Sequence, residues 1–370
     1  MNKTRKNEYN PDYVSPPGET LQELLDTQGL SQADLSIRTG RPKKTINEII
    51  LGKAAITPDT AIQLERVLNV PAEFWLTREA HYRAWLAHKD DDLRIDKEKD
   101  LVKQLPLKDM ESLGWIEKFD DTREKFKAIL SFFGVVSLDR LPFVEEAAFR
   151  KSEKFAVNKW ALAAWLRKGE LEAQKIRCRP YNSDKFLEAL SAIRTLTAED
   201  PKVFVPKLIS HCANAGVCLV FIPELPKTSV SGATRWLSPD KAMIQLSLRC
   251  KCNDMFWFSF FHEAGHVYNE HAKREVLLET DFKGFLDQRE IIANKFATDL
   301  LISKTDFTEF VGKSTFSAES IKQFSRNIGV APGIVVGRLQ HEKIIGWERF
   351  RTLKKEFSWD QWPKSCSNQD

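Results

Sequence analysis

Residues 255–266 read Met-Phe-Trp-Phe-Ser-Phe-Phe-His-Glu-Ala-Gly-His, an aromatic run that ends in two histidines four positions apart. At about 3.6 residues per turn, such positions share one face of a helix, so the imidazoles of His262 and His266 can reach one ion. Glu263 lies between them and can touch an ion-bound water without being a ligand. A helix that is apolar on most sides is buried, and its polar groups need partners. The stretch therefore predicts a buried helix that carries a metal site.

This H-E-x-x-H spacing is typical of zinc peptidases, in which the glutamate is the general base. Gly265 lies inside the motif, although helix propensity disfavours glycine at such a position. A close packing contact, or open space for a ligand, would explain it. The alternative interpretation is a solvated helix with two unrelated histidines. The aromatic run before the motif argues against that alternative.

A catalytic zinc site needs a third protein ligand and an open fourth position. The candidate is Glu290, which lies 24 positions after His266 (290 − 266) and leaves room for a second helix that turns back on the first. Apolar residues recur around it at helical spacing: Ile291, Ile292, Phe296, Leu300 and Leu301. Asn294 follows one turn later and could fix the tautomer of a ligand histidine. The alternative makes Glu290 an ordinary exposed carboxylate, and we favour the ligand role because of the histidine pair.

His262-Glu263-x-x-His266, followed by Glu290-x-x-Ala293-Asn294-x-Phe296-Ala297, resembles the ImmA/IrrE metallopeptidases, whose pattern is HExxH and then E-x-x-A-N/D-x-F-A. The resemblance covers residues 200–310. It implies a small gluzincin-like domain in which His262, His266 and Glu290 bind zinc (Zn2+) and Glu263 is the catalytic carboxylate. It also implies a protein substrate, often an XRE-type repressor. Ser303 departs from the pattern, because proline is common there.

The composition is that of a globular protein. The 370 residues are enough for two or three domains, and the net charge of +4 is too weak by itself to indicate a nucleic-acid partner. The first six residues lack the apolar core of a signal peptide, and no apolar run approaches the roughly 18 residues of a membrane span. The six cysteines form no dense framework. We therefore expect a cytoplasmic protein with no membrane partner.

Short helical segments follow one another near the N-terminus. Ser31 suits the N-cap of one helix, Gly40 makes the turn after it, and Pro42 suits the first position of the next helix. Thr57 and Pro58 start another helix in the same way. Two short helices joined by a glycine-containing turn form a helix-turn-helix, whose second helix enters the major groove of DNA.

Basic residues gather around this second helix, and a local basic patch is the footprint expected for phosphate binding. The candidate DNA contacts are Gln32, Arg41, Lys43, Lys44, Thr45 and Asn47. The alternative is a small helical bundle whose charged face is only solvated.

The segments 30–35 and 46–53, with Gly40 between them, resemble the XRE-type repressors. The continuation 56–61 and Glu73-Phe74-Trp75-Leu76 is similar to the HigA branch, the antitoxins of toxin–antitoxin modules. This match spans residues 18–86. It implies sequence-specific binding of operator DNA as a homodimer, and it leaves a toxin open as a second partner.

The remaining segments complete a fold that is mainly α with a small sheet (α+β). Three apolar runs predict strands at 217–222, 231–237 and 242–248. Residues 96–200 read as helices without recognisable chemistry, and 317–339 read as a helix pair. The expected domains are an all-α helix-turn-helix domain (1–88), a helical middle region (89–200), the metallopeptidase domain (201–310) and a C-terminal helical extension (311–370).

These patterns together favour a DNA-binding transcriptional regulator with a zinc endopeptidase that cleaves a regulatory protein, either an XRE-type repressor or the chain itself. The alternative is a HigA-type antitoxin that binds operator DNA and a toxin, with a structural or sensory zinc and no peptidase activity. The fourth zinc position discriminates between them. A fourth protein ligand, for instance a cysteine or His271, would close the site.

Overall fold

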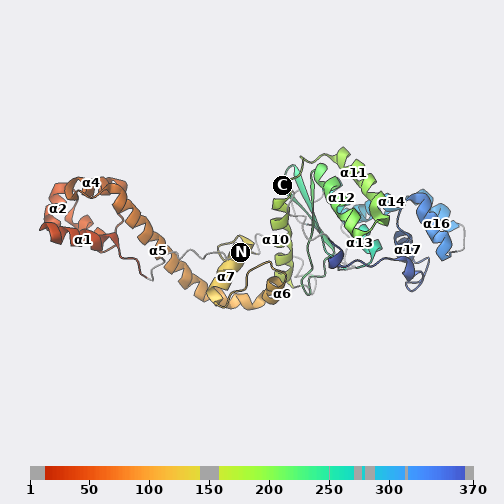
Figure 1. The fold of residues 1–370 in the computed structure, drawn as a ribbon, viewed down its shortest axis with the longest axis horizontal. Helices are drawn as coiled ribbons and strands as arrows, with labels where there is room; N and C mark the ends of the chain where they lie inside the picture. The colour runs from red at the N-terminus through yellow and green to blue at the C-terminus, as the bar shows by residue number, and fades with distance from the viewer. Residues whose placement is uncertain are drawn as a thin grey trace. The chain divides into compact units, whose positions relative to one another are not determined.

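The computed structural model describes residues 13–141, 158–249, 251–270, 277–279, 288–312 and 316–362 (Figure 1). The chain divides into two compact units, Met1–Asp100 and Leu101–Asp370. Helices predominate and one small sheet lies in the second unit, which confirms the predicted α+β class. Over the described ranges, none of the helices combines the length and apolar character that crossing a membrane requires.

From residue 13 onward, the described part of the first unit contains five α-helices: α1 (Pro17–Gln28), α2 (Gln32–Thr39), α3 (Lys43–Ile50), α4 (Pro58–Leu68) and α5 (Ala72–Glu98). Ser31 and Asp34 form a reciprocal capping box at the start of α2, and Gly40 ends that helix with a φ of 68°. Leu35, Ile46 and Trp75 belong to the buried core that these helices share. The predicted helix-turn-helix is therefore present, with Pro42 as the N-cap of α3 instead of its first helical residue.

The acidic run at residues 90–92 is part of α5. Arg94 Nη2 lies 2.6 Å from Asp91 Oδ1, three residues earlier in the helix. Arg94 Nη1 lies 3.5 Å from Glu98 Oε1, four residues later. Such pairs support a helix. The charged segment at residues 90–92 is thus helical.

The second unit contains these longer helices: α6 (Leu107–Ser112), α7 (Thr122–Phe133), α10 (Lys159–Lys175), α11 (Ser183–Thr195), α12 (Pro201–Asn214), α13 (Asn253–Tyr268), α14 (Gln288–Leu301), α15 (Lys304–Gly312), α16 (Ala318–Ile328) and α17 (Pro332–His341). The last two form the predicted pair, and Gly329 ends α16 with a φ of 69°. Proline at the start of α17 suits its first turn.

The sheet has the strand order β1-β3-β2-β4, with β1 (Val217–Phe221), β2 (Gly232–Ser238), β3 (Lys241–Leu246) and β4 (Leu277–Glu279). β1 is parallel to β3, and the other two pairs are antiparallel. The first three strands match the predicted runs. The fourth has three residues and no alternating pattern that the sequence could reveal. Figure 1 shows α10 on one face of the sheet and α12 and α13 on the other.

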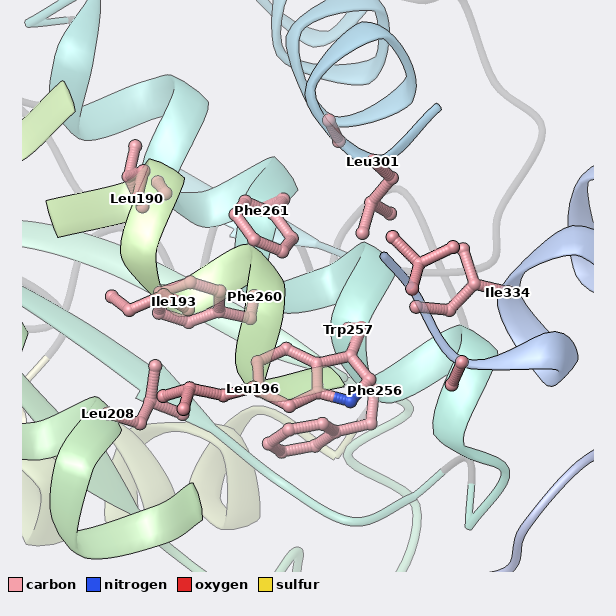
Figure 2. Packing of buried hydrophobic residues seen from close by; sticks show 14 of the residues in the cluster. Leu190, Ile193, Leu196, Leu208, Phe256, Trp257, Phe260, Phe261, Leu301 and Ile334 are labelled. Carbon is pink, nitrogen blue, oxygen red and sulfur yellow. The ribbon is translucent and has the colours of Figure 1, made fainter. Parts of the chain in front are cut away.

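Helix α13 is the centre of the second unit. Its aromatic side chains Phe256, Trp257, Phe260 and Phe261 are buried, as the sequence predicts. Figure 2 shows them among apolar side chains from four other helices: Leu190 and Ile193 of α11, Leu208 of α12, Leu301 of α14 and Ile334 of α17. Burying an aromatic side chain of this size stabilises the fold by roughly 1.5–3 kcal/mol. This packing fixes the helix that carries the histidines.

Candidate metal centre

Two helices bring together three side chains of the types that can bind a metal. His262 and His266 project from α13, and Glu290 projects from the first turn of α14. The two Nε2 atoms lie 3.0 Å apart. Glu290 Oε2 lies 3.2 Å from His262 Nε2, and Glu290 Oε1 lies 3.5 Å from His266 Nε2. The histidines are buried, while the side chain of Glu290 is 26% exposed, so the group is open on the glutamate side.

These separations suit one zinc ion. Ligand atoms at about 2.0–2.2 Å from a tetrahedral zinc lie about 3.3–3.5 Å from one another. Over the described residues, these three side chains are the group of metal-ligand types whose donor atoms lie within 4.8 Å of each other. His271, which the sequence offers as a fourth ligand, lies outside the described residues. The donor set of two imidazoles and one carboxylate therefore fits zinc.

The close approach of α14 to α13 depends on small residues. A Cβ atom at Gly265 would lie 3.1 Å from Phe296 Cδ1 and 3.2 Å from the Ala293 Cα, so the glycine leaves room for the second helix. The buried residues of α14 are Ala293, Ala297 and Leu301. Ile291 and Ile292 are exposed, which the helical spacing of apolar residues does not predict. A close helix crossing accepts alanine more readily than a branched side chain.

Asn294 lies beside the histidine pair. Its Oδ1 is 2.9 Å from His262 Nδ1. A proton on Nδ1 would be donated to this oxygen, which leaves the Nε2 lone pair directed at the ligand position. Burial lowers the pKa of His266, which favours the neutral ring that a metal needs. Burial alone would raise the pKa of Glu290, but the hydrogen bonds and charges of the two imidazoles, when these are protonated at Nε2, outweigh it and hold that pKa well below its usual range.

Glu263 faces the sheet from α13 and is fully buried. Its Oε2 accepts a hydrogen bond of 2.5 Å from the Thr234 hydroxyl on β2. Gly232 shares that face of β2, and a Cβ atom there would lie 2.7 Å from Glu263 Oε1. The strand therefore both holds this carboxylate and leaves space for it. Sequence reasoning does not identify these two residues, because nothing near them in the chain marks them.

The candidate DNA contacts divide into two sets. Lys43, Lys44 and Asn47 are exposed on α3, opposite the buried Ile46 and Ile49, and Lys44 lies 3.8 Å from Glu48. The other three are half-buried: Gln32, Arg41 and Thr45.

Two of the half-buried side chains have partners inside the first unit. Gln32 donates to Gln22 at 3.0 Å, and Arg41 Nε donates to Gln63 at 2.6 Å. These two side chains therefore help to hold the helices of the first unit together.

Comparison with known proteins matches each unit to a family. Residues 21–75 match the family described as Helix-turn-helix, and residues 218–340 match the peptidase family described as IrrE N-terminal-like domain. The second match contains the histidine pair, Glu263 and Glu290.

Individual relatives cover about a quarter of the chain. Over 89 residues, this chain is 30% identical to the uncharacterized HTH-type transcriptional regulator YddM of Escherichia coli. The matched segment makes up 24% of this chain and 92% of that protein. Among solved structures, it is similar to an addiction module antidote protein of the HigA family from Coxiella burnetii (31% identity, 23% of this chain, 94% of that chain, TM-score 0.21). It is also similar to the structure of Pseudomonas aeruginosa antitoxin HigA with higBA promoter (29% identity, 23% of this chain, 95% of that chain, TM-score 0.22).

Proposed function

Because the chain belongs to the helix-turn-helix regulators through its N-terminal domain and contains an IrrE N-terminal-like domain in its C-terminal part, we propose that it is a transcriptional regulator with its own zinc-dependent endopeptidase. The observation that carries this proposal is the group of His262, His266 and Glu290. The carboxylate of Glu263 lies on α13, the helix that also carries the two histidines. The substrate is a regulatory protein, either an XRE-type repressor or the chain itself. Loss of cleavage by a zinc-loaded Glu263 variant tests the proposal.

In this mechanism His262, His266 and Glu290 would hold zinc, and the bound ion would supply the positive charge that polarises the scissile carbonyl and acidifies water. Glu263 takes a proton from the attacking water and passes it to the leaving amine. Thr234 holds the Glu263 carboxylate through its hydroxyl, so the base is positioned before substrate arrives. Burial of the base keeps bulk water from competing for the proton.

The zinc site depends on Asn294 through the tautomer of His262. Replacing Asn294 by alanine removes the hydrogen-bond acceptor at Nδ1, so we expect zinc affinity to fall by about 10- to 100-fold. Competition with a chromogenic chelator measures that affinity. The matched control is Asn294→Asp, which keeps an acceptor oxygen and should retain most of the affinity. Equal affinities for wild type and Asn294→Ala would contradict this role.

We also propose that the first unit binds operator DNA as a homodimer, with α3 as the recognition helix. The relative from Pseudomonas aeruginosa has been solved with its promoter. The exposed side chains of α3 include the two lysines Lys43 and Lys44. Lysines there neutralise phosphates, and release of condensed counterions makes such binding salt-dependent.

Charge reversal on α3 tests the DNA interface. The double change Lys43→Glu and Lys44→Glu should weaken binding to an operator selected by the wild-type protein. It should also lower the slope of log affinity against log salt by about 2, because each phosphate contact contributes about 0.9. Fluorescence anisotropy over a salt series measures both. The control is Lys202→Glu with Lys207→Glu on α12, which changes the net charge equally. Unchanged binding by the α3 variant would show that another surface contacts DNA.

The alternative is an antitoxin with a structural zinc, and it requires a closed metal site. The described residues supply three donor groups, one of them partly exposed, which favours the peptidase. A zinc-loaded protein whose zinc has four protein ligands would favour the antitoxin.

A further inference from the structure

Helix α10 lies on the face of the sheet that points away from Glu263 (Figure 1). Thr234 contacts the Glu263 carboxylate, so alternation along β2 turns the next side chain, Arg235, toward α10. Arg235 Nη1 lies 3.4 Å from Oε2 of Glu170 on that helix. The two side chains are 13% and 23% exposed, so salt screens this ion pair only in part. One residue of β2 thus holds the Glu263 carboxylate, and the next is bound to α10.

The same oxygen of Glu170 binds a second cation. Arg167, one turn earlier on α10, places its Nη1 2.8 Å from Glu170 Oε2. Its Nε donates to the Phe132 carbonyl at 2.8 Å. That carbonyl lies in the last turn of α7, where backbone oxygens have no partner inside the helix and favour a cation. One carboxylate therefore joins β2 to α10 and, through Arg167, to the end of α7.

A second contact fixes α10 beside the same stretch of β2. Gln245 of β3 is fully buried and is paired in the sheet with Ala233 of β2. Its Nε2 donates to the Trp165 carbonyl of α10 at 2.7 Å. Gly169 lets the helix come this close, because a Cβ atom there would collide with the Gln245 amide. The position of α10 on the sheet is therefore fixed at the level of Ala233.

We propose that Glu170 is a positioning residue for the peptidase, an inference that rests on the proposed function. Its carboxylate balances the charges of Arg167 and Arg235. The strand then stays where Thr234 meets the Glu263 carboxylate. Without Glu170, two like charges would be left close together in a half-buried site, and their repulsion would push Arg235 and its strand away from α10. The middle region, for which the sequence suggests no chemistry, thereby acts on the reaction without touching substrate.

Steady-state cleavage by zinc-loaded, full-length variants tests the proposal. Glu170→Ala should lower kcat by about tenfold and change KM by less than about twofold, because a displaced base slows proton transfer and leaves the substrate contacts intact. Glu170→Gln keeps an oxygen acceptor for both arginines and should lose less. The matched control is Glu172→Ala, because that side chain is also 23% exposed but pairs with Lys168 and Lys175 of α10 itself. This control should cleave as wild type does.

A double variant shows whether Glu170 acts through Thr234. Thr234→Val removes the hydroxyl that holds the Glu263 carboxylate, and we expect it to lower kcat by itself. Adding Glu170→Ala should then cost less than about twofold, whereas it costs about tenfold in the wild-type background. A merely structural ion pair would give the same factor in both backgrounds, and that result would overturn the proposal.

Hydrogen exchange of the peptide that covers β2 gives a readout that needs no cleavage. Its amides should exchange at least about threefold faster in Glu170→Ala than in wild type or in Glu172→Ala. Unchanged exchange, or an unchanged kcat in Glu170→Ala, would overturn the proposal. If zinc-loaded wild type cleaves no candidate substrate, the proposed function fails instead, and faster exchange would still show that Glu170 fixes β2.

Discussion

Glu263→Gln is expected to reduce peptide cleavage by about 10²- to 10⁴-fold, while the zinc content stays that of wild type. The amide has almost the shape of the carboxylate but cannot accept the proton of the attacking water. The three ligand atoms lie on other side chains, so zinc binding should not depend on this change. The Thr234 hydroxyl can still donate to the amide oxygen, which keeps the side chain in place.

The measurement compares cleavage of candidate XRE-type repressors, and of the chain itself, by zinc-loaded wild type and variant. Metal content is determined on the same samples. Glu188→Gln, at an exposed position on α11, is the matched control and should cleave normally. Cleavage that survives in Glu263→Gln would contradict the assignment of Glu263 as the base.

The second large effect concerns the metal itself. Replacing His262 or Glu290 by alanine removes one of three ligands from the zinc. Loss of a hydrogen bond to a ligand lowers metal affinity by up to roughly 100-fold, and we expect loss of a ligand itself to lower the zinc affinity by more. The purified protein should therefore lose its stoichiometric zinc. Elemental analysis after gel filtration measures this content. Circular dichroism checks that the helices remain.

His341→Ala provides the control, because that histidine is exposed at the end of α17 and outside the ligand group. It should keep full zinc. A Glu290→Ala protein that still holds stoichiometric zinc would mean that α14 does not supply the third ligand. Together the two experiments separate the chemistry of the base from retention of the ion.

Local signals in the sequence predicted much of the fold. Ser31, Gly40 and Gly329 mark helix ends through hydrogen bonds and backbone angles that involve only nearby residues. The i, i+4 spacing of His262 and His266 fixes their common face in the same way. Each of these features needs no information from distant parts of the chain.

Other features of the site required distant contacts. The sequence placed Glu290 as a candidate ligand, but its approach to the histidines depends on small residues where α13 and α14 cross. Thr234 and Gly232 lie about thirty positions before Glu263, and only the packing of β2 on α13 brings them to its carboxylate. The exposure of Ile291 and Ile292 likewise reflects which face of α14 is buried.

The sequence alone thus determined the helix-turn-helix, the first three strands and which side chains are candidate metal ligands, since spacing and capping act over a few residues. The tertiary structure decided which strand holds the carboxylate of Glu263 and which face of α14 is buried. Those outcomes come from packing between segments far apart in the chain, where side-chain size and burial, not periodicity, select the contacts.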